Sequence, residues 1–250
     1  MKALWSKLDQ DGDGQVTAAE GWGALRRELQ KVTMDAPVVL SLCGACVAVH
    51  LVTVLIWPSL TQDYFQLWPW AYSSPGRVMF YVRMVTQVLG HASWEHLSGN
   101  LTLLILVGPA SEVAYGPQVL MRVMLLTAVV TSLFHYLLAP RNAVQLGASG
   151  IAYMLIMLNS LRDHQAGQIR ASFLALLVLW ISKEGFSLLR SLMPGGASDG
   201  VSHHCHLLGA MVGAAAGLLL KEPAARVQAE QLCRRLLATL KTLPARLKLL

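Results

Sequence analysis

The most prominent pattern along this 250-residue chain is a series of apolar stretches separated by shorter polar segments. A helix that crosses a bilayer needs about 20 predominantly apolar residues, and every stretch except the fourth approaches that length. The pattern therefore predicts an all-α membrane protein in which six transmembrane helices form one bundle. The apolar stretches lie near residues 37–57, 97–115, 118–139, 149–161, 171–189 and 205–220.

The fourth stretch is too short to span a membrane. With a rise of about 1.5 Å per residue, it cannot cross roughly 30 Å of hydrocarbon. We therefore expect Ser149 and Gly150, at its start, to lie below the membrane surface. Irregular backbone cannot face lipid at that depth, so the segment before Ser149 is expected to line a wet cavity with protein walls.

A long segment rich in aromatic residues separates the first two stretches. Amphipathic rings are typical of the interface between membrane and water. We therefore predict an outer loop that is partly inserted in the membrane. Its aromatic residues include Trp57, Trp68, Trp70, Tyr72 and Trp94.

The composition agrees with a membrane protein, because 54% of the residues are hydrophobic, only 14% are charged, and the mean hydropathy is +0.49. A soluble domain carries about a quarter charged residues. The net charge is +6, but the positive side chains flank apolar stretches and lack interleaved aromatic residues, which argues against a nucleic-acid partner. The four cysteines predict neither a disulfide framework nor a zinc site.

The distribution of positive side chains predicts the topology. With the N-terminus inside, few of the 20 lysines and arginines fall in outer loops, and an odd number of spans would destroy this asymmetry. We therefore expect both termini in the cytosol. An acidic loop near the start argues against a secretory signal and a mitochondrial presequence, so a membrane of the secretory pathway or the plasma membrane is expected. The outer positive residues are Arg77, Arg83, Arg141 and Arg190, and Lys183 falls within the fifth stretch.

These patterns divide the chain into three parts. Residues 1–35 form a polar head, residues 36–221 the six-helix domain, and residues 222–250 a basic amphipathic tail. Such a tail helix is suited to the anionic inner leaflet, and a solvated helix is the alternative.

The head contains a sequence that matches the EF-hand calcium loop. Ca²⁺ prefers six to eight oxygen ligands, and the glycine at the sixth loop position allows the sharp turn that brings them together. The head is therefore predicted to bind calcium and to modulate activity, whereas an acidic, solvated loop is the alternative. The expected ligands are Asp9, Asp11, Asp13, the carbonyl of Gln15, Thr17 and both carboxylate oxygens of Glu20.

Three polar clusters occur in or beside the apolar stretches, where ionisable side chains are costly and indicate function. His96 and Asn100 lie four residues apart and share a helix face. Gly147-Ala148-Ser149-Gly150 opens the fourth stretch, and His206 begins the sixth. A ladder of glycines follows His206 on the same face, at positions 209, 213 and 217.

Together these clusters predict a hydrolytic site. The glycine ladder allows close approach of the sixth helix to the fourth, which would bring His206 to Ser149. Serine becomes a nucleophile when a histidine takes its proton, and Tyr153, one turn further on, is placed to stack on the imidazole. We expect His96, Asn100 and the Ser149 N–H to stabilise the oxyanion.

No acid that could orient His206 is evident, so a Ser–His dyad is predicted. His203 or His204 is the rival base if the register of the sixth helix differs.

These motifs resemble those of rhomboid intramembrane serine proteases over roughly residues 75–220. The resemblance implies a six-helix bundle with Ser149 as nucleophile, His206 as base, and His96 and Asn100 as oxyanion donors. It also implies cleavage of single-span membrane proteins near the outer membrane face, with lipid as surroundings and no cofactor for catalysis. An EF-hand ahead of the core is similar to some eukaryotic rhomboids.

Two alternatives remain open at this stage. A catalytically silent rhomboid-like protein would use the same cavity to hold membrane partners. A calcium-responsive channel or transporter would need polar pathways and paired halves, and no internal repeat is visible.

Overall fold

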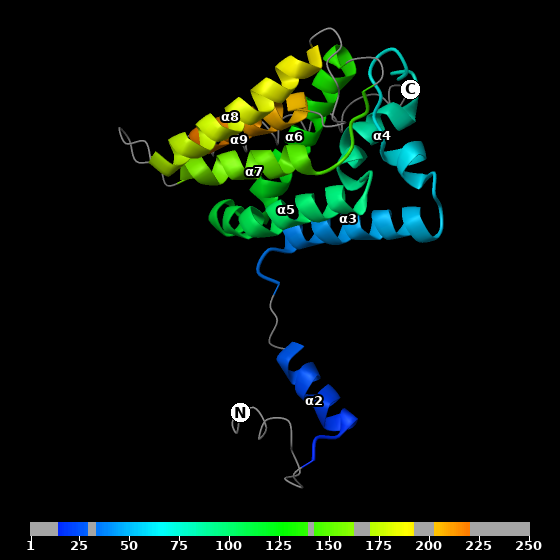
Figure 1. The fold of residues 1–250 in the computed structure, drawn as a ribbon, viewed down its shortest axis with the longest axis vertical. Helices are drawn as coiled ribbons and strands as arrows, with labels where there is room; N and C mark the ends of the chain where they lie inside the picture. The colour runs from blue at the N-terminus through cyan, green and yellow to red at the C-terminus, as the bar shows by residue number, and fades with distance from the viewer. Residues whose placement is uncertain (1–14, 30–33, 140–142, 163–170, 193–202, 221–250) are drawn as a thin grey trace, which may run out of the picture. The chain divides into compact units, whose positions relative to one another are not determined.

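A computed structural model describes residues 15–29, 34–139, 143–162, 171–192 and 203–220 of the chain (Figure 1). The chain divides into two compact units, Met1–Asp35 and Ala36–Leu250. The described residues are helical and contain no β-strand, and Leu67 and Gln145 form an isolated β-bridge. The predicted all-α class is therefore confirmed.

The first unit contains helix α2 (Ala18–Leu29). The Thr17 N–H donates to Glu20 Oε2 over 2.9 Å, and the Glu20 N–H donates to Thr17 Oγ1 over 3.3 Å. This reciprocal arrangement is a capping box, which satisfies backbone donors that the first turn of a helix leaves unpaired. It fixes the start of α2 within the last positions of the predicted calcium loop, which ends at Glu20.

In the second unit, each of the six apolar stretches coincides with a helix. Within the described part of the chain, α3, α5 and α6 are long and apolar enough to cross a membrane. These helices indicate an integral membrane protein, whereas six complete spans stay a prediction. The six helices are α3 (Pro37–Leu55), α5 (Trp94–Tyr115), α6 (Pro117–Leu138), α7 (Ser149–Arg162), α8 (Ala171–Leu192) and α9 (His203–Leu219).

The aromatic segment between α3 and α5 is more ordered than the expected loop. It contains a π-helical turn, η1 (Thr61–Phe65), helix α4 (Val78–Thr86) and a short 3₁₀ turn, η2 (Gln87–Leu89). The Arg83 guanidinium donates to the carbonyl oxygen of Asp63, which ties α4 to η1. The sequence did not predict helix α4, because α4 has only nine residues and lies within a segment that is rich in apolar and aromatic residues throughout.

A buried carboxylate joins α3 to α5. Glu112 accepts the N–H groups of Val38 over 2.9 Å and Val39 over 3.0 Å. These donors belong to the first turn of α3, where unpaired N–H groups and the helix dipole favour negative charge. Glu112 therefore acts as the cap of α3.

Helices α7 and α9 pack with unusually close backbones. A Cβ atom at Gly209 would lie 2.1 Å from the Gly150 carbonyl oxygen, and one at Gly213 would lie 2.2 Å from that of Met154. Figure 1 shows α7, α8 and α9 gathered on one side of this unit, with α3 and α5 alongside each other. The close approach predicted from the glycine ladder is therefore present.

Candidate active site

Ser149 is the first residue of α7, and the turn before it depends on glycine. Gly147 has a φ of +103°, a conformation that glycine adopts far more readily than other residues. A Cβ atom there would lie 2.7 Å from the His96 ring and 3.2 Å from the Asn100 amide nitrogen. Gly147 therefore both makes the turn and leaves space for two of the predicted site residues.

The structure brings Ser149 and His206 together. His206 Nε2, on α9, lies 2.8 Å from Ser149 Oγ, on α7. Tyr153 packs against the imidazole, with ring centroids 4.4 Å apart and planes inclined by 31°. The pairing predicted from sequence, including the position of the aromatic ring, is therefore what the geometry shows.

A third side chain, Glu184 on α8, also contacts His206, so the expectation that no acid orients this imidazole is wrong. Glu184 Oε2 lies 2.9 Å from His206 Nδ1 and 2.6 Å from His203 Nδ1. The Tyr153 hydroxyl donates to Glu184 Oε1 over 3.0 Å. Sequence reasoning missed Glu184 because it belongs to no motif, although an acidic residue inside an apolar stretch was itself a signal.

These contacts determine where His206 carries its proton. An ionised carboxylate can only accept hydrogen bonds, so the proton of a neutral His206 resides on Nδ1, facing Glu184. Nε2 then presents a lone pair to the Ser149 hydroxyl, which donates to it. This is the tautomer that a general base for serine requires.

The two predicted oxyanion donors flank Gly147, two residues before Ser149. The Asn100 amide donates from Nδ2 to His91 Nε2 over 2.9 Å, while His91 Nδ1 donates to the Leu89 carbonyl over 3.2 Å. The pKa of His91 is lowered to about 4, mainly by burial and then by the neighbouring His96. His91 therefore stays a neutral acceptor and orients Asn100.

The rival bases have other partners. His204 Nε2 pairs with His135 Nδ1 over 3.1 Å, and His203 Nδ1 donates to Glu184. His206 is the imidazole that reaches the serine hydroxyl. The register expected for the sixth helix is therefore correct.

Two groups of side chains in the described residues have the spacing of a metal site. The first comprises Glu184, His203 and His206, and the second comprises His135, His204 and Cys205. In the first group, Nδ1 of each histidine donates to Glu184, and in the second group His135 Nδ1 pairs with His204 Nε2. Of the predicted calcium ligands, Gln15, Thr17 and Glu20 are described, whereas Asp9, Asp11 and Asp13 lie outside the described residues.

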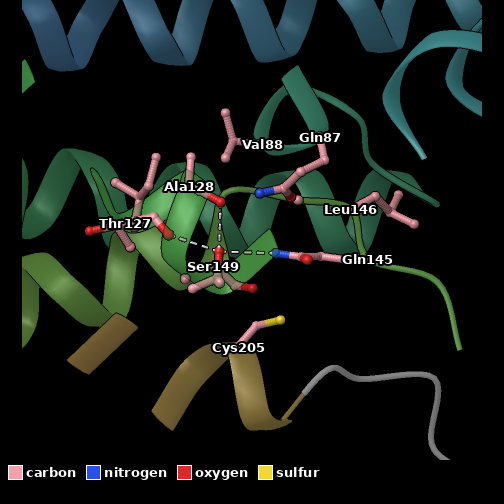
Figure 2. A pocket seen from close by; sticks show the side chains of 12 residues that line it. Gln87, Val88, Thr127, Ala128, Gln145, Leu146, Ser149 and Cys205 are labelled. Carbon is pink, nitrogen blue, oxygen red and sulfur yellow. Dashed lines mark hydrogen bonds between the residues drawn. The ribbon is translucent and has the colours of Figure 1, made fainter. Parts of the chain in front are cut away.

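A small cavity of about 10 Å³ lies beside Ser149 (Figure 2). The segment before Ser149 lines it, as expected, and Figure 2 shows the side chains of Gln145 and Cys205 among those around the cavity. Gln145 Nε2 donates to Thr131 Oγ1 over 3.1 Å. The Oε1 atoms of Gln87 and Gln145 are buried and have no hydrogen-bond partner among the described residues. The sequence did not predict that Gln87 and Gln145 line the cavity.

Comparison with known proteins identifies the family. Residues 79–223 match the family model described as the Rhomboid domain. The chain belongs to the rhomboid family. The matched region of this rhomboid includes Ser149, Glu184 and His206, so the whole hydrogen-bonded group lies within the family domain.

One curated relative comes from a plant. This rhomboid is 33% identical over 151 residues to "Rhomboid-like protein 11, chloroplastic" from Arabidopsis thaliana. The alignment covers 57% of this chain and 54% of the relative, so the chain spans about half the length of that protein.

Proposed function

We propose that this rhomboid is an intramembrane serine protease that cleaves single-span membrane proteins near the outer membrane face. The observation that carries the proposal is the 2.8 Å contact between Ser149 Oγ and His206 Nε2, two residues 57 positions apart. The glycine ladder that permits this contact supports the proposal, because Gly209 and Gly213 lie against the backbone of the serine helix.

In this mechanism, Ser149 Oγ attacks the substrate peptide carbonyl while His206 Nε2 takes the hydroxyl proton. The tetrahedral intermediate carries an oxyanion, which the Ser149 N–H and the His96 and Asn100 side chains are placed to stabilise. His206 then gives its proton to the leaving amine, and an acyl-enzyme remains.

Water must attack this acyl-enzyme, and the cavity beside Ser149 is suited to hold it. Its volume of about 10 Å³ is near the minimum for one water molecule. The buried Oε1 atoms of Gln87 and Gln145 are acceptors for such a water, and burying them unpaired is costly. The cavity therefore supplies a water site within a largely apolar helix bundle.

The expected substrate is a transmembrane segment that unwinds locally. A regular helix uses its carbonyl groups in internal hydrogen bonds, so a strained or extended stretch must reach Ser149. Small or helix-breaking residues near the cleaved bond are expected for this reason.

The head is proposed to bind Ca²⁺ through the loop ending at Glu20 and to modulate cleavage. Glu20 also caps α2, so Glu20→Ala would remove a cap and a ligand together. Glu20→Gln keeps a capping acceptor but loses the bidentate carboxylate. We expect it to abolish Tb³⁺ luminescence sensitised by Trp22 and to remove any calcium dependence of cleavage. Unchanged luminescence would contradict this calcium site.

The test of the main proposal is cleavage of a panel of tagged single-span proteins in liposomes. We expect turnover by the wild-type protein and none by Ser149→Ala. Ser160→Ala is the matched control, because Ser160 lies on the same helix and donates to the Ile156 carbonyl over 2.7 Å. Cleavage by Ser149→Ala at the wild-type rate would refute the proposal.

A further inference from the structure

We propose that Glu184 is the positioning residue of the Ser149–His206 pair. Its carboxylate holds His206 with the proton on Nδ1 and stabilises the imidazolium that forms when His206 takes the serine proton. This inference rests on the proposed protease function and extends it from two side chains to a hydrogen-bonded set of three.

The hydrogen bonds described for Glu184 join it to His206 and to two side chains beside His206, those of His203 and Tyr153. The side chain is 2% exposed. Oε2 accepts the Nδ1–H groups of His206 and His203, and Oε1 accepts the Tyr153 hydroxyl. Because Tyr153 also packs on the His206 ring, one residue of α7 orients both the acid and the imidazole.

Burial of a carboxylate in an apolar bundle needs an explanation. Transfer of such a charge from water is costly unless hydrogen bonds and opposite charge compensate for it. Among the described residues, the side chains beside the Glu184 carboxylate that can carry a positive charge are His203 and His206, each only when it is protonated. Full compensation therefore requires a protonated imidazole, which appears at His206 during the reaction.

The proton balance of this step is simple. The Ser149 hydroxyl proton moves to His206 Nε2 as the Oγ–carbon bond forms, and the Nδ1 proton stays between His206 and Glu184. When the carbon–nitrogen bond breaks, the proton on Nε2 leaves with the amine. Glu184 remains a carboxylate throughout, and its attraction for the imidazolium is stronger in an apolar interior than in water.

His203 has a supporting place in this arrangement. Its ring is nearly perpendicular to that of His206, at a centroid separation of 6.1 Å. Because both imidazoles donate to the same oxygen, His203 restricts rotation of the carboxylate. Among the described residues, Tyr153 on α7 is a further titratable group in contact with Glu184.

A purely structural reading would make Glu184 a tie between α8 and α9. The variant Glu184→Gln separates the two readings, because it keeps the size of the side chain and removes the charge. Labelling with a serine-reactive fluorophosphonate gives two readouts. The labelled fraction at saturation counts folded sites, and the rate constant for labelling measures the reactivity of each site.

We expect Glu184→Gln to lower the labelling rate constant and kcat by on the order of 10²–10⁴-fold, with KM nearly unchanged. The matched control is Glu112→Gln, which alters another buried glutamate away from the site. It should leave the rate constant and kcat unchanged, whatever its effect on the labelled fraction. A Glu184→Gln protein with a reduced labelled fraction and a wild-type rate constant would overturn the inference.

A second measurement uses the wild-type protein, so its result does not depend on whether Glu184→Gln folds. In protein with ¹⁵N-labelled histidine, NMR should show His206 protonated on Nδ1 and unprotonated on Nε2 near neutral pH, with the signals assigned by their loss in His206→Gln. A proton on Nε2 would contradict the proposed role of Glu184. Failure of the protease proposal would be visible separately, as cleavage by Ser149→Ala.

Discussion

Two buried glutamates of this rhomboid, Glu112 on α5 and Glu184 on α8, differ in their partners rather than in their burial. Their side chains belong to residues that are 3% and 1% exposed. Glu112 accepts two backbone N–H groups at the start of α3, whereas Glu184 accepts two imidazole N–H groups and a phenol. Backbone amides keep their protons near neutral pH and imidazoles exchange theirs, so the first acid stabilises a helix end and the second can assist proton transfer.

The glycines of the two regions show the same contrast. On α9, a Cβ atom at Gly209 would collide with the backbone of α7, whereas a Cβ atom at Gly44 on α3 would meet nothing within 4 Å. The packing around Ser149 and His206 is therefore specified at the level of the backbone. The α3 helix has room for an added methyl group.

Removal of the His206 imidazole should have the greatest effect on activity. His206→Gln deprives Ser149 of its proton acceptor, so kcat should fall by on the order of 10⁴-fold or more. The measurement is the initial rate of substrate cleavage in liposomes. Because His135 is buried and pairs with another histidine outside the catalytic pair, His135→Gln is the control for loss of a buried imidazole. An equal loss of kcat in both variants would show that the loss of any buried imidazole has this effect, and it would contradict the role proposed for His206.

The next largest effect tests whether one helix serves both regions. Asn100 and Glu112 lie on α5, and only Asn100 is proposed to donate to the oxyanion. Asn100→Ala should lower kcat by about 10²–10³-fold with little change in KM, as measured by steady-state kinetics. A rise in KM with kcat unchanged would show that Asn100 binds substrate rather than stabilising the oxyanion.

The glycine contrast gives a smaller effect. Gly209→Ala places a Cβ atom 2.1 Å from the Gly150 carbonyl oxygen, so the helices must separate and Ser149 must move from His206. We expect about a 10–100-fold loss of kcat and a lower Tm in detergent. Gly44→Ala is the control, and it should leave both unchanged or raise the Tm slightly through its greater helix propensity. Equal behaviour of the two variants would contradict the close-packing account.

The smallest expected effect concerns pH and the orientation of Asn100. The pKa of His91 is lowered by burial from its ordinary value of 6.5 to about 4. The unfolded chain therefore binds a proton at this site more readily, so the contribution of His91 to stability is complete above about pH 6.5 and is lost as the pH falls toward 4. The Tm in detergent should decrease over that range, and the decrease should be smaller in His91→Gln. An identical pH dependence in both proteins would exclude His91 as a source.

Local spacing explains why much of the site could be predicted. His206 and Gly209 share a helix face, and Ser149 and Tyr153 lie one turn apart, so their relative positions follow from the period of a helix. The six helices likewise follow from the lengths of the apolar stretches.

Glu184 could not be placed in the same way. It lies 19 and 22 residues from its two histidine partners, on a different helix. Its contact depends on how α8 is placed and rotated against α7 and α9, and the pattern of a single helix does not specify which residues of its neighbours it meets. The positions of Gln87 and Gln145 beside the cavity could not be predicted for a related reason. Tertiary packing of irregular segments brings these residues to the cavity that Ser149 also lines.

The central claim is that His206 activates Ser149 as a nucleophile, and mass spectrometry of the fluorophosphonate-treated protein tests it most directly. We expect a covalent adduct on Ser149 in the wild-type protein and none, under the same conditions, in folded His206→Gln. Absence of an adduct from the folded wild-type protein, or equal modification of both proteins, would contradict it.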